Sequence, residues 1–84
     1  MNITDDDIIA MLNDGITTVP DMTFHLMRME PIPPALMDYK TWMEYRRVSQ
    51  QLWVRMNKLR KWKEVEVVVE GNGPHRITVW RAVA

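Results

Sequence analysis

The residues most able to do chemistry in this chain are the cations that gather between positions 44 and 63. That segment holds seven lysines and arginines and one acid, Glu44, although the 84-residue chain has no net charge. The cations are Arg46, Arg47, Arg55, Lys58, Arg60, Lys61 and Lys63. Positive charge concentrated on one element of a neutral protein attracts a polyanion. Duplex nucleic acid is the commonest such partner, and a helix fits its major groove.

The apolar residues of the same segment predict the helix that would carry these cations. They recur at spacings of three and four, as Tyr45, Val48, Leu52, Met56 and Leu59, which is typical of one buried stripe. The opposite face holds Arg47, Gln50, Val54, Asn57 and Lys61, flanked by Arg46 and Lys58. Cations and amides on one exposed face suit phosphates and base edges. The alternative is an ordinary solvated surface helix.

Charge is distributed unevenly along the whole chain. Residues 1–30 contain six acids and one base, a net charge of −5, and residues 31–84 contain ten bases and five acids, a net charge of +5. We expect an electrical dipole with one end able to approach a polyanion. The alternative is that the two halves neutralise each other across the fold or across a dimer contact.

The first helix is expected to begin after Thr4 and to stop at Gly15. Thr4 and Asp7 have the spacing of a capping box, and Ile3 and Ile8 occupy the two positions of a hydrophobic staple. Glycine after the last helical turn is a common stop. The acids of this first turn are therefore interpreted as helix-start residues and not as a metal site.

A second helix is expected after Val19, with Pro20 at its first position. Its apolar face would contain Met22, Leu26 and Met29. The prolines at 31, 33 and 34 predict a non-helical connector, with a short helical turn at 35–39.

The long helix is expected to start near Trp42 and to cover 42–62. The reason is that Thr41 and Glu44 form a second capping-box pattern.

From Glu64 the period of the sequence changes to two, which predicts a half-buried strand. Val65, Val67 and Val69 would face one way and the glutamates the other. Residues 70–76 have the composition of a hairpin turn, with Asn-Gly at its centre. The segment 77–83 alternates again and should pair antiparallel with the first strand.

The order of helix, helix, long helix and hairpin resembles the winged helix-turn-helix family, most of whose members are DNA-binding regulators. The residues that carry the resemblance are Leu52-x3-Met56-x2-Leu59-x5-Val65, similar to a recognition helix entering the first wing strand, and Arg76 to Val83, similar to the returning strand. Two features depart from the family pattern. Lys63 stands where a glycine is common, and the connector before the long helix is long and proline-rich.

The resemblance implies an α+β fold of three helices and a two-stranded antiparallel hairpin wing, formed by residues 1–84 as one domain. It also implies which residues read DNA. The base-reading candidates are Arg46, Arg47, Gln50 and Gln51, supported by Lys58 and Lys61, and the wing candidates are His75 and Arg76.

Other classes of function are disfavoured by what the sequence lacks. It has no cysteine, no apolar run of membrane-spanning length, and neither a nucleophile–histidine–acid set nor a glycine-rich phosphate loop. We therefore expect a cytoplasmic protein that is not an enzyme and binds no cofactor or membrane.

Two functions from different classes remain. The first is a small transcription regulator that binds double-stranded DNA, with a homodimer expected because one module covers few base pairs. The second is a protein-interaction module that acts through its acidic N-terminal half or through the connector at 30–40. The clustered bases favour the first function, and the sequence pI of about 6.7 favours the second.

Overall fold

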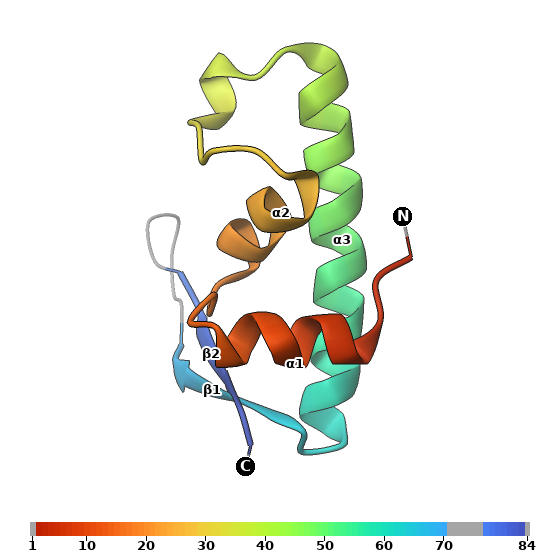
Figure 1. Ribbon diagram of the computed structural model, residues 1–84, viewed down its shortest axis with the longest axis vertical. Coiled ribbons are helices and arrows are strands. Elements are labelled where there is room, and N and C mark those ends of the chain that lie inside the picture. Colours follow the sequence, from red (N-terminus) through yellow and green to blue (C-terminus); the bar gives the residue numbers. More distant parts are fainter. Residues whose placement is uncertain (1, 71–76, 84) are drawn as a thin grey trace.

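A computed structural model describes residues 2–70 and 77–83 of the chain (Figure 1). Within these ranges the elements are α1 (Asp5–Asn13), α2 (Val19–Met27), the 3-10 helix η1 (Pro34–Leu36), α3 (Tyr39–Lys61), β1 (Val65–Val69) and β2 (Val79–Ala82). The two strands pair antiparallel. The prediction of an α+β fold with three helices followed by a two-stranded hairpin sheet is confirmed.

Helix α3 runs along the longest dimension of the molecule, whose extents are 38 × 30 × 20 Å. Helices α1 and α2 lie across its middle and lower part, and the sheet lies beside its C-terminal end (Figure 1). The N-terminal turns of α3 and the connector with η1 extend beyond these packed elements. The C-terminal half of α3 therefore packs against the rest of the domain along one face, while its first turns project beyond it.

The start of α1 is the predicted capping box. The Thr4 hydroxyl accepts a hydrogen bond from the Asp7 N–H at 3.1 Å, and the Asp7 carboxylate accepts one from the Thr4 N–H at 3.0 Å. Ile3 and Ile8, the two residues of the predicted staple, are both buried in the core cluster. These local interactions fix where the chain enters its first helix.

Two exposed aspartates that cap helices, Asp7 and Asp38, have pKa values below the ordinary 3.8. The main cause is a backbone N–H that donates to each carboxylate, from Thr4 and from Thr41 respectively. Because the folded pKa is lowered, this stabilisation is present above the unfolded pKa and is lost as the pH falls through the folded pKa.

We therefore expect the melting temperature to fall as the pH drops below about 4. The variant carrying both Asp7→Asn and Asp38→Asn should melt lower at neutral pH and show a shallower acid-induced loss. Thermal melts followed by circular dichroism across this pH range measure both effects. An unchanged acid limb in the double variant would contradict the capping assignment.

Each of the three α-helices in the described ranges is followed by a residue with a positive φ. These residues have φ values of 87°, 56° and 60° and are, in chain order, Gly15, Arg28 and Lys63. After α3 the Lys63 N–H donates to the Arg60 carbonyl at 3.0 Å. The following N–H, of Glu64, donates to the Leu59 carbonyl at 2.9 Å. This is a Schellman motif, and the residue held at positive φ is a lysine instead of the glycine that is usual at this position.

Replacing Lys63 with glycine is expected to raise the free energy of unfolding by about 0.5–1 kcal/mol. Left-handed backbone costs a non-glycine residue about 1–2 kcal/mol, partly offset by the greater freedom of glycine in the unfolded chain, about 0.5–1 kcal/mol. Lys63→Ala removes the same charge without relieving the strain and is the matched control. Urea unfolding of both variants measures the difference, and equal stabilities would show that the turn is unstrained.

Two predicted helix starts are wrong by a few residues. Helix α3 begins at Tyr39 and not near Trp42, because the Asp38 side chain accepts a hydrogen bond from the Thr41 N–H at 2.7 Å and acts as N-cap. Helix α2 begins at Val19 instead of Pro20, because Thr18 caps it. In both cases a capping side chain starts the helix before the position that the sequence pattern predicts.

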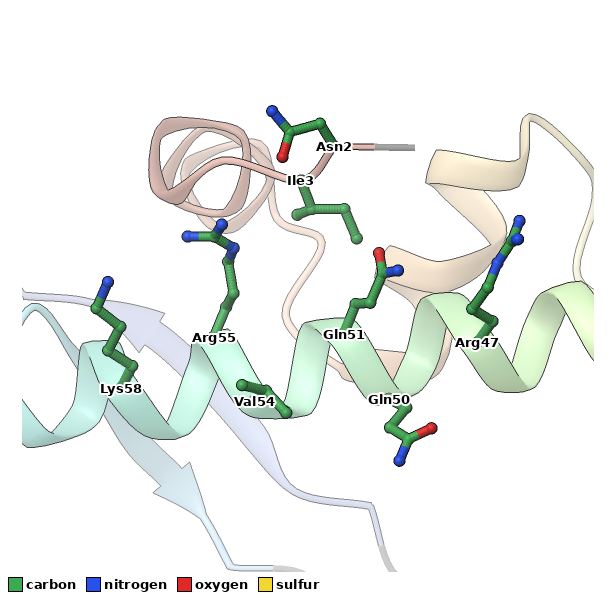
Figure 2. A pocket seen from close by; sticks show the side chains of 8 residues that line it. All are labelled: Asn2, Ile3, Arg47, Gln50, Gln51, Val54, Arg55 and Lys58. Atoms are coloured by element: carbon green, nitrogen blue, oxygen red, sulfur yellow. The ribbon is translucent and has the colours of Figure 1, made fainter.

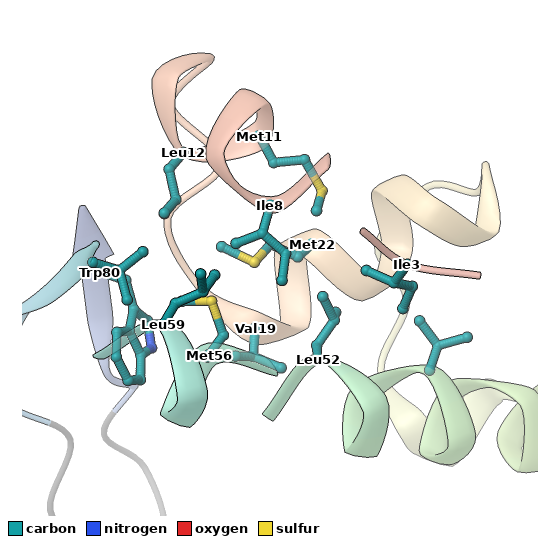
Figure 3. Packing of buried hydrophobic residues seen from close by; sticks show 12 residues of the cluster. Ile3, Ile8, Met11, Leu12, Val19, Met22, Leu52, Met56, Leu59 and Trp80 are labelled. Carbon is teal, nitrogen blue, oxygen red and sulfur yellow. The ribbon is translucent and has the colours of Figure 1, made fainter. Parts of the chain in front are cut away.

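The core is one cluster to which the three α-helices and both strands contribute (Figure 3). Four of the five residues of the predicted stripe on α3 are fully buried, namely Val48, Leu52, Met56 and Leu59. They pack with Ile8, Met11 and Leu12 of α1, Val19 and Met22 of α2, and Val65 and Trp80 of the sheet. The fifth stripe residue, Tyr45, is half-buried, with its ring centroid 5.1 Å from that of Phe24.

The buried face of α2 is only partly the predicted one. Met22 is buried as expected, but Leu26 and Met29 are half-buried, and Thr23 and Phe24 are buried instead. The Thr23 hydroxyl donates to the Val19 carbonyl at 2.8 Å and lies 2.9 Å from the Ser49 hydroxyl on α3. Because its hydrogen bonds are made inside the fold, this polar side chain can be buried at a position that was not part of the predicted apolar face.

The sheet is shorter and less regular than the alternation predicted. Strand β2 covers Val79–Ala82 and not 77–83, and the register shifts between Val67 and Val69. Val65 is buried, but Val69 is exposed because of this irregularity. The backbone N–H of Trp80 also donates to the Thr17 carbonyl at 2.8 Å, which ties β2 to the segment between α1 and α2. The predicted hairpin turn lies mostly in 71–76, outside the described residues.

Candidate nucleic-acid interface

The exposed side of α3 and the N-terminal segment form an open groove of about 650 Å³. We call it the α1–α3 groove. It is lined by Asn2, Ile3, Arg47, Gln50, Gln51, Val54, Arg55 and Lys58 (Figure 2). Six of these eight residues come from α3, and Ile3 and Asn2 form the opposite wall. The groove therefore lies along the polar face of the helix whose other face is the core.

Charge in the α1–α3 groove is positive and mostly uncompensated. Arg55 pairs with Asp5 of α1 at 3.1 Å, with both side chains more than a third exposed. Neither of the salt bridges found among the described residues involves Arg47 or Lys58. An exposed ion pair contributes about 0–1 kcal/mol to stability, so Arg55–Asp5 orients Arg55 more than it stabilises the fold. Arg47 and Lys58 stay available to an anionic ligand.

The acids at the start of α1 lie close to this groove and reduce its positive electrostatic potential. Asp5 is occupied by Arg55, and the Asp7 carboxylate accepts the Thr4 N–H. Two of the three acids of this turn are thus engaged within the protein. The acidic and basic halves do meet across the fold, as the second interpretation of the charge asymmetry required, but among the described residues they meet in the single ion pair of Arg55 with Asp5.

The structure places most of the predicted site residues on one exposed surface. Arg47, Gln50, Gln51 and Lys58 line the α1–α3 groove together. Lys61 is exposed one turn beyond Lys58 but does not line it. The predicted wing residues His75 and Arg76 lie outside the described residues.

Arg46 is placed differently from its neighbour Arg47. Its guanidinium carbon lies 6.0 Å from the centroid of the Trp42 ring, on the other flank of α3. It lines a second depression with Lys40, Met43 and Glu44, which Arg47 and Gln50 also border. Arg46 therefore extends the basic surface toward the N-terminal end of α3, instead of joining the groove.

Four of the residues that line the groove were not predicted as DNA contacts, namely Asn2, Ile3, Val54 and Arg55. Arg55 lies one turn after Gln51 and three residues before Lys58, so its position on that side of the helix follows from helical spacing. Asn2 precedes α1 and reaches the groove only through the tertiary fold. No local sequence pattern predicts that Asn2 lies beside α3.

Two other features are absent from the part of the chain that the structure describes. No three histidine, aspartate or glutamate side chains gather there as metal ligands. None of the helices in these ranges combines the length and apolar character of a membrane span.

Comparisons of the chain with protein-family models, with curated proteins and with solved structures gave no significant match.

Proposed function

We propose that this chain is a small cytoplasmic regulator of the winged helix-turn-helix type that binds duplex DNA through the exposed face of α3. The observation that carries the proposal is the α1–α3 groove, where two cations without a salt bridge to any described residue and two amides line one face of a helix anchored by its other face. Such a helix can enter a major groove without disturbing the core. The proposed role is binding alone, with neither a catalysed reaction nor a cofactor.

The spacing along α3 suits this role. Arg47 and Lys58 are separated by 11 positions, or about 16 Å along the helix axis. A major groove is about 12 Å wide, so the two cations can reach phosphates on opposite sides of it. Gln50 and Gln51 lie between them, and glutamine can hydrogen-bond an adenine edge in a bidentate manner. In this arrangement the cations position the helix and the amides read sequence.

The position of the sheet supports the winged-helix assignment. Strand β1 follows α3 after the Schellman turn at Lys63, and β2 returns antiparallel to it. The hairpin is thus attached to the C-terminal end of the proposed recognition helix, where a wing would contact the DNA backbone. The sequence assigns this contact to His75 and Arg76.

One observation favours the alternative function, a protein-interaction module. The large apolar side chains of Leu36, Tyr39 and Met43 are exposed on the projection formed by the connector and the start of α3. None of these three residues lines the α1–α3 groove, although Met43 shares the second depression with Arg47 and Gln50, so the two activities depend on different side chains. DNA binding and protein binding are therefore separable by mutation.

The proposal is tested by titrating the protein into fluorescently labelled random-sequence duplex at two salt concentrations, about 50 and 200 mM. We expect binding at the lower concentration and a marked loss of affinity at the higher one, because phosphate contacts release counterions. An absence of binding at low salt, by a protein that is folded by circular dichroism, would reject DNA binding.

A further inference from the structure

The N-terminal turns of α3 project beyond the body of the domain together with the connector that carries η1 (Figure 1). We call residues 32–46 the arm. Three of its large apolar side chains are open to solvent, with 73% of Leu36, 78% of Tyr39 and 45% of Met43 exposed. Tyr39 and Met43 are four residues apart and therefore share one face of α3. Single exposed apolar residues are common, but three within eight positions form a patch that indicates an interaction surface.

The charged residues around this patch have a pattern that identifies its partner. Their order is Asp38, Lys40, Glu44 and Arg46, which alternates in sign and reverses about Trp42. All four side chains are exposed, and none forms a salt bridge within the part of the chain that the structure describes. Asp38 and Arg46 are each four positions from Trp42, and Lys40 and Glu44 are each two positions from it.

We propose that the arm binds the arm of a second copy of this chain in an antiparallel, two-fold arrangement. When two identical helices pair antiparallel about Trp42, Lys40 of one copy lies opposite Glu44 of the other, and Asp38 opposite Arg46. The symmetry makes each of these pairs occur twice. Tyr39 and Met43 lie in the centre of the contact, where burial of their apolar surface supplies the main stabilisation.

Other arrangements of two copies conflict with the charges. A parallel pairing in register sets each charge against the same charge of its partner, for example Lys40 against Lys40, which is destabilising. A contact along the whole of α3 would bring together the unpaired cations at Arg47, Lys58 and Lys61. Only the N-terminal part of α3 is electrically complementary to itself. An unrelated partner gives no reason for an order of charges that, when reversed, carries the opposite sign at every position.

The pairing leaves the α1–α3 groove open. From Trp42 to the middle of the groove near Leu52 is ten residues, or about 15 Å along α3. Two grooves related by the two-fold axis then lie about 30 Å apart along the direction of the paired helices. This distance is close to the half-site spacing of about 34 Å that one turn of duplex imposes. The self-association itself does not depend on the proposed DNA binding and is tested without DNA.

The experiment is sedimentation equilibrium of the full chain and of charge-reversal variants in the absence of DNA. The wild-type chain is expected to dimerise. Lys40→Glu and Glu44→Lys each place like charges opposite one another, so each should weaken the dimer by about tenfold or more. The double variant restores opposite charges and should recover the wild-type association. Glu70→Lys, a reversal at an exposed site outside the arm, should leave it unchanged.

A mixture of the two single variants gives the sharpest test. A chain with Lys40→Glu carries two acids at these positions and a chain with Glu44→Lys carries two bases, so the two should form a heterodimer more tightly than either associates with itself. Folding of each variant is checked by circular dichroism. A wild-type chain that stays monomeric at high concentration would overturn the proposal. So would single variants that neither weaken the dimer nor prefer each other in the mixture.

Discussion

Replacing Leu52 with alanine is expected to lower the free energy of unfolding by about 2–5 kcal/mol. The Leu52 side chain is fully buried in the middle of the stripe that α3 presents to the core. Its truncation removes apolar contacts and leaves a cavity that close-packed neighbours refill only in part. A domain of this size is expected to have a total stability near the lower end of 5–15 kcal/mol. The loss is therefore a large share of the whole, and Met56→Ala should act similarly because Met56 is equally buried.

Val54 provides the matched control on the same helix. It lies two residues from Leu52 but faces outward, with 66% of its surface exposed. Val54→Ala should change stability by less than about 0.5 kcal/mol. Thermal and urea unfolding of the two single variants decide the matter. A comparable loss in Val54→Ala would mean that α3 is buried on both sides, and its polar face would then be closed to DNA.

Replacing Arg47 and Lys58 together with alanine is expected to weaken DNA binding by on the order of ten- to hundredfold. Both cations lie in the α1–α3 groove without a carboxylate partner among the described residues. If each contacts one phosphate, the slope of log affinity against log salt should become shallower by about two units. Fluorescence titrations of labelled duplex over a range of salt concentrations give both quantities. Both side chains are exposed, so the fold should be retained.

The control for this double variant is Arg81→Ala. Arg81 is exposed on β2 and forms a salt bridge with Glu66, so its charge is already compensated. We expect it to change the affinity and the salt slope little. An equal effect of the two variants would show that binding responds to overall charge and not to the groove.

The sequence predicted the core face of α3 because helical spacing depends only on the order of residues. Val48, Leu52, Met56 and Leu59 are buried at the expected positions. The start of α1 was predictable for the same reason, since a capping box joins residues three apart. Interactions that span only a turn or two of chain can be read from local pattern.

Features that depend on competition or on distant contacts were not predictable. Asp38 and Thr41 both have the residue type of an N-cap, and the choice of Asp38 adds three residues to the start of α3. Burial of Thr23 depends on Ser49, a partner 26 residues away that satisfies its hydroxyl. The irregular pairing between Val67 and Val69 and the hydrogen bond from the Trp80 backbone to Thr17 both join segments that are distant in the sequence.

The candidate site also combines residues whose positions follow from local spacing with residues that distant contacts place. The positions of Arg47, Gln50 and Lys58 on one face follow from their spacing, and the structure brings them into one groove. The wall formed by Asn2 and the pairing of Arg55 with Asp5 arise from the packing of α1, about 50 residues earlier in the chain. The separation of Arg46 from the groove also follows from spacing, because one residue turns the helix by about 100°, and its contact with Trp42 is with a residue four positions earlier.

The most direct test of the central claim is an NMR titration of isotopically labelled protein with random-sequence duplex. Binding through the exposed face of α3 predicts that the largest amide shift changes cluster at Arg47, Gln50, Gln51 and Lys58, and that Asp14 at the far end of α1 is unaffected. The changes should diminish when the salt concentration is raised, because the contacts include phosphates. Shift changes confined to the acidic helix α1 or to the connector, with the α3 face unaltered, would contradict the account.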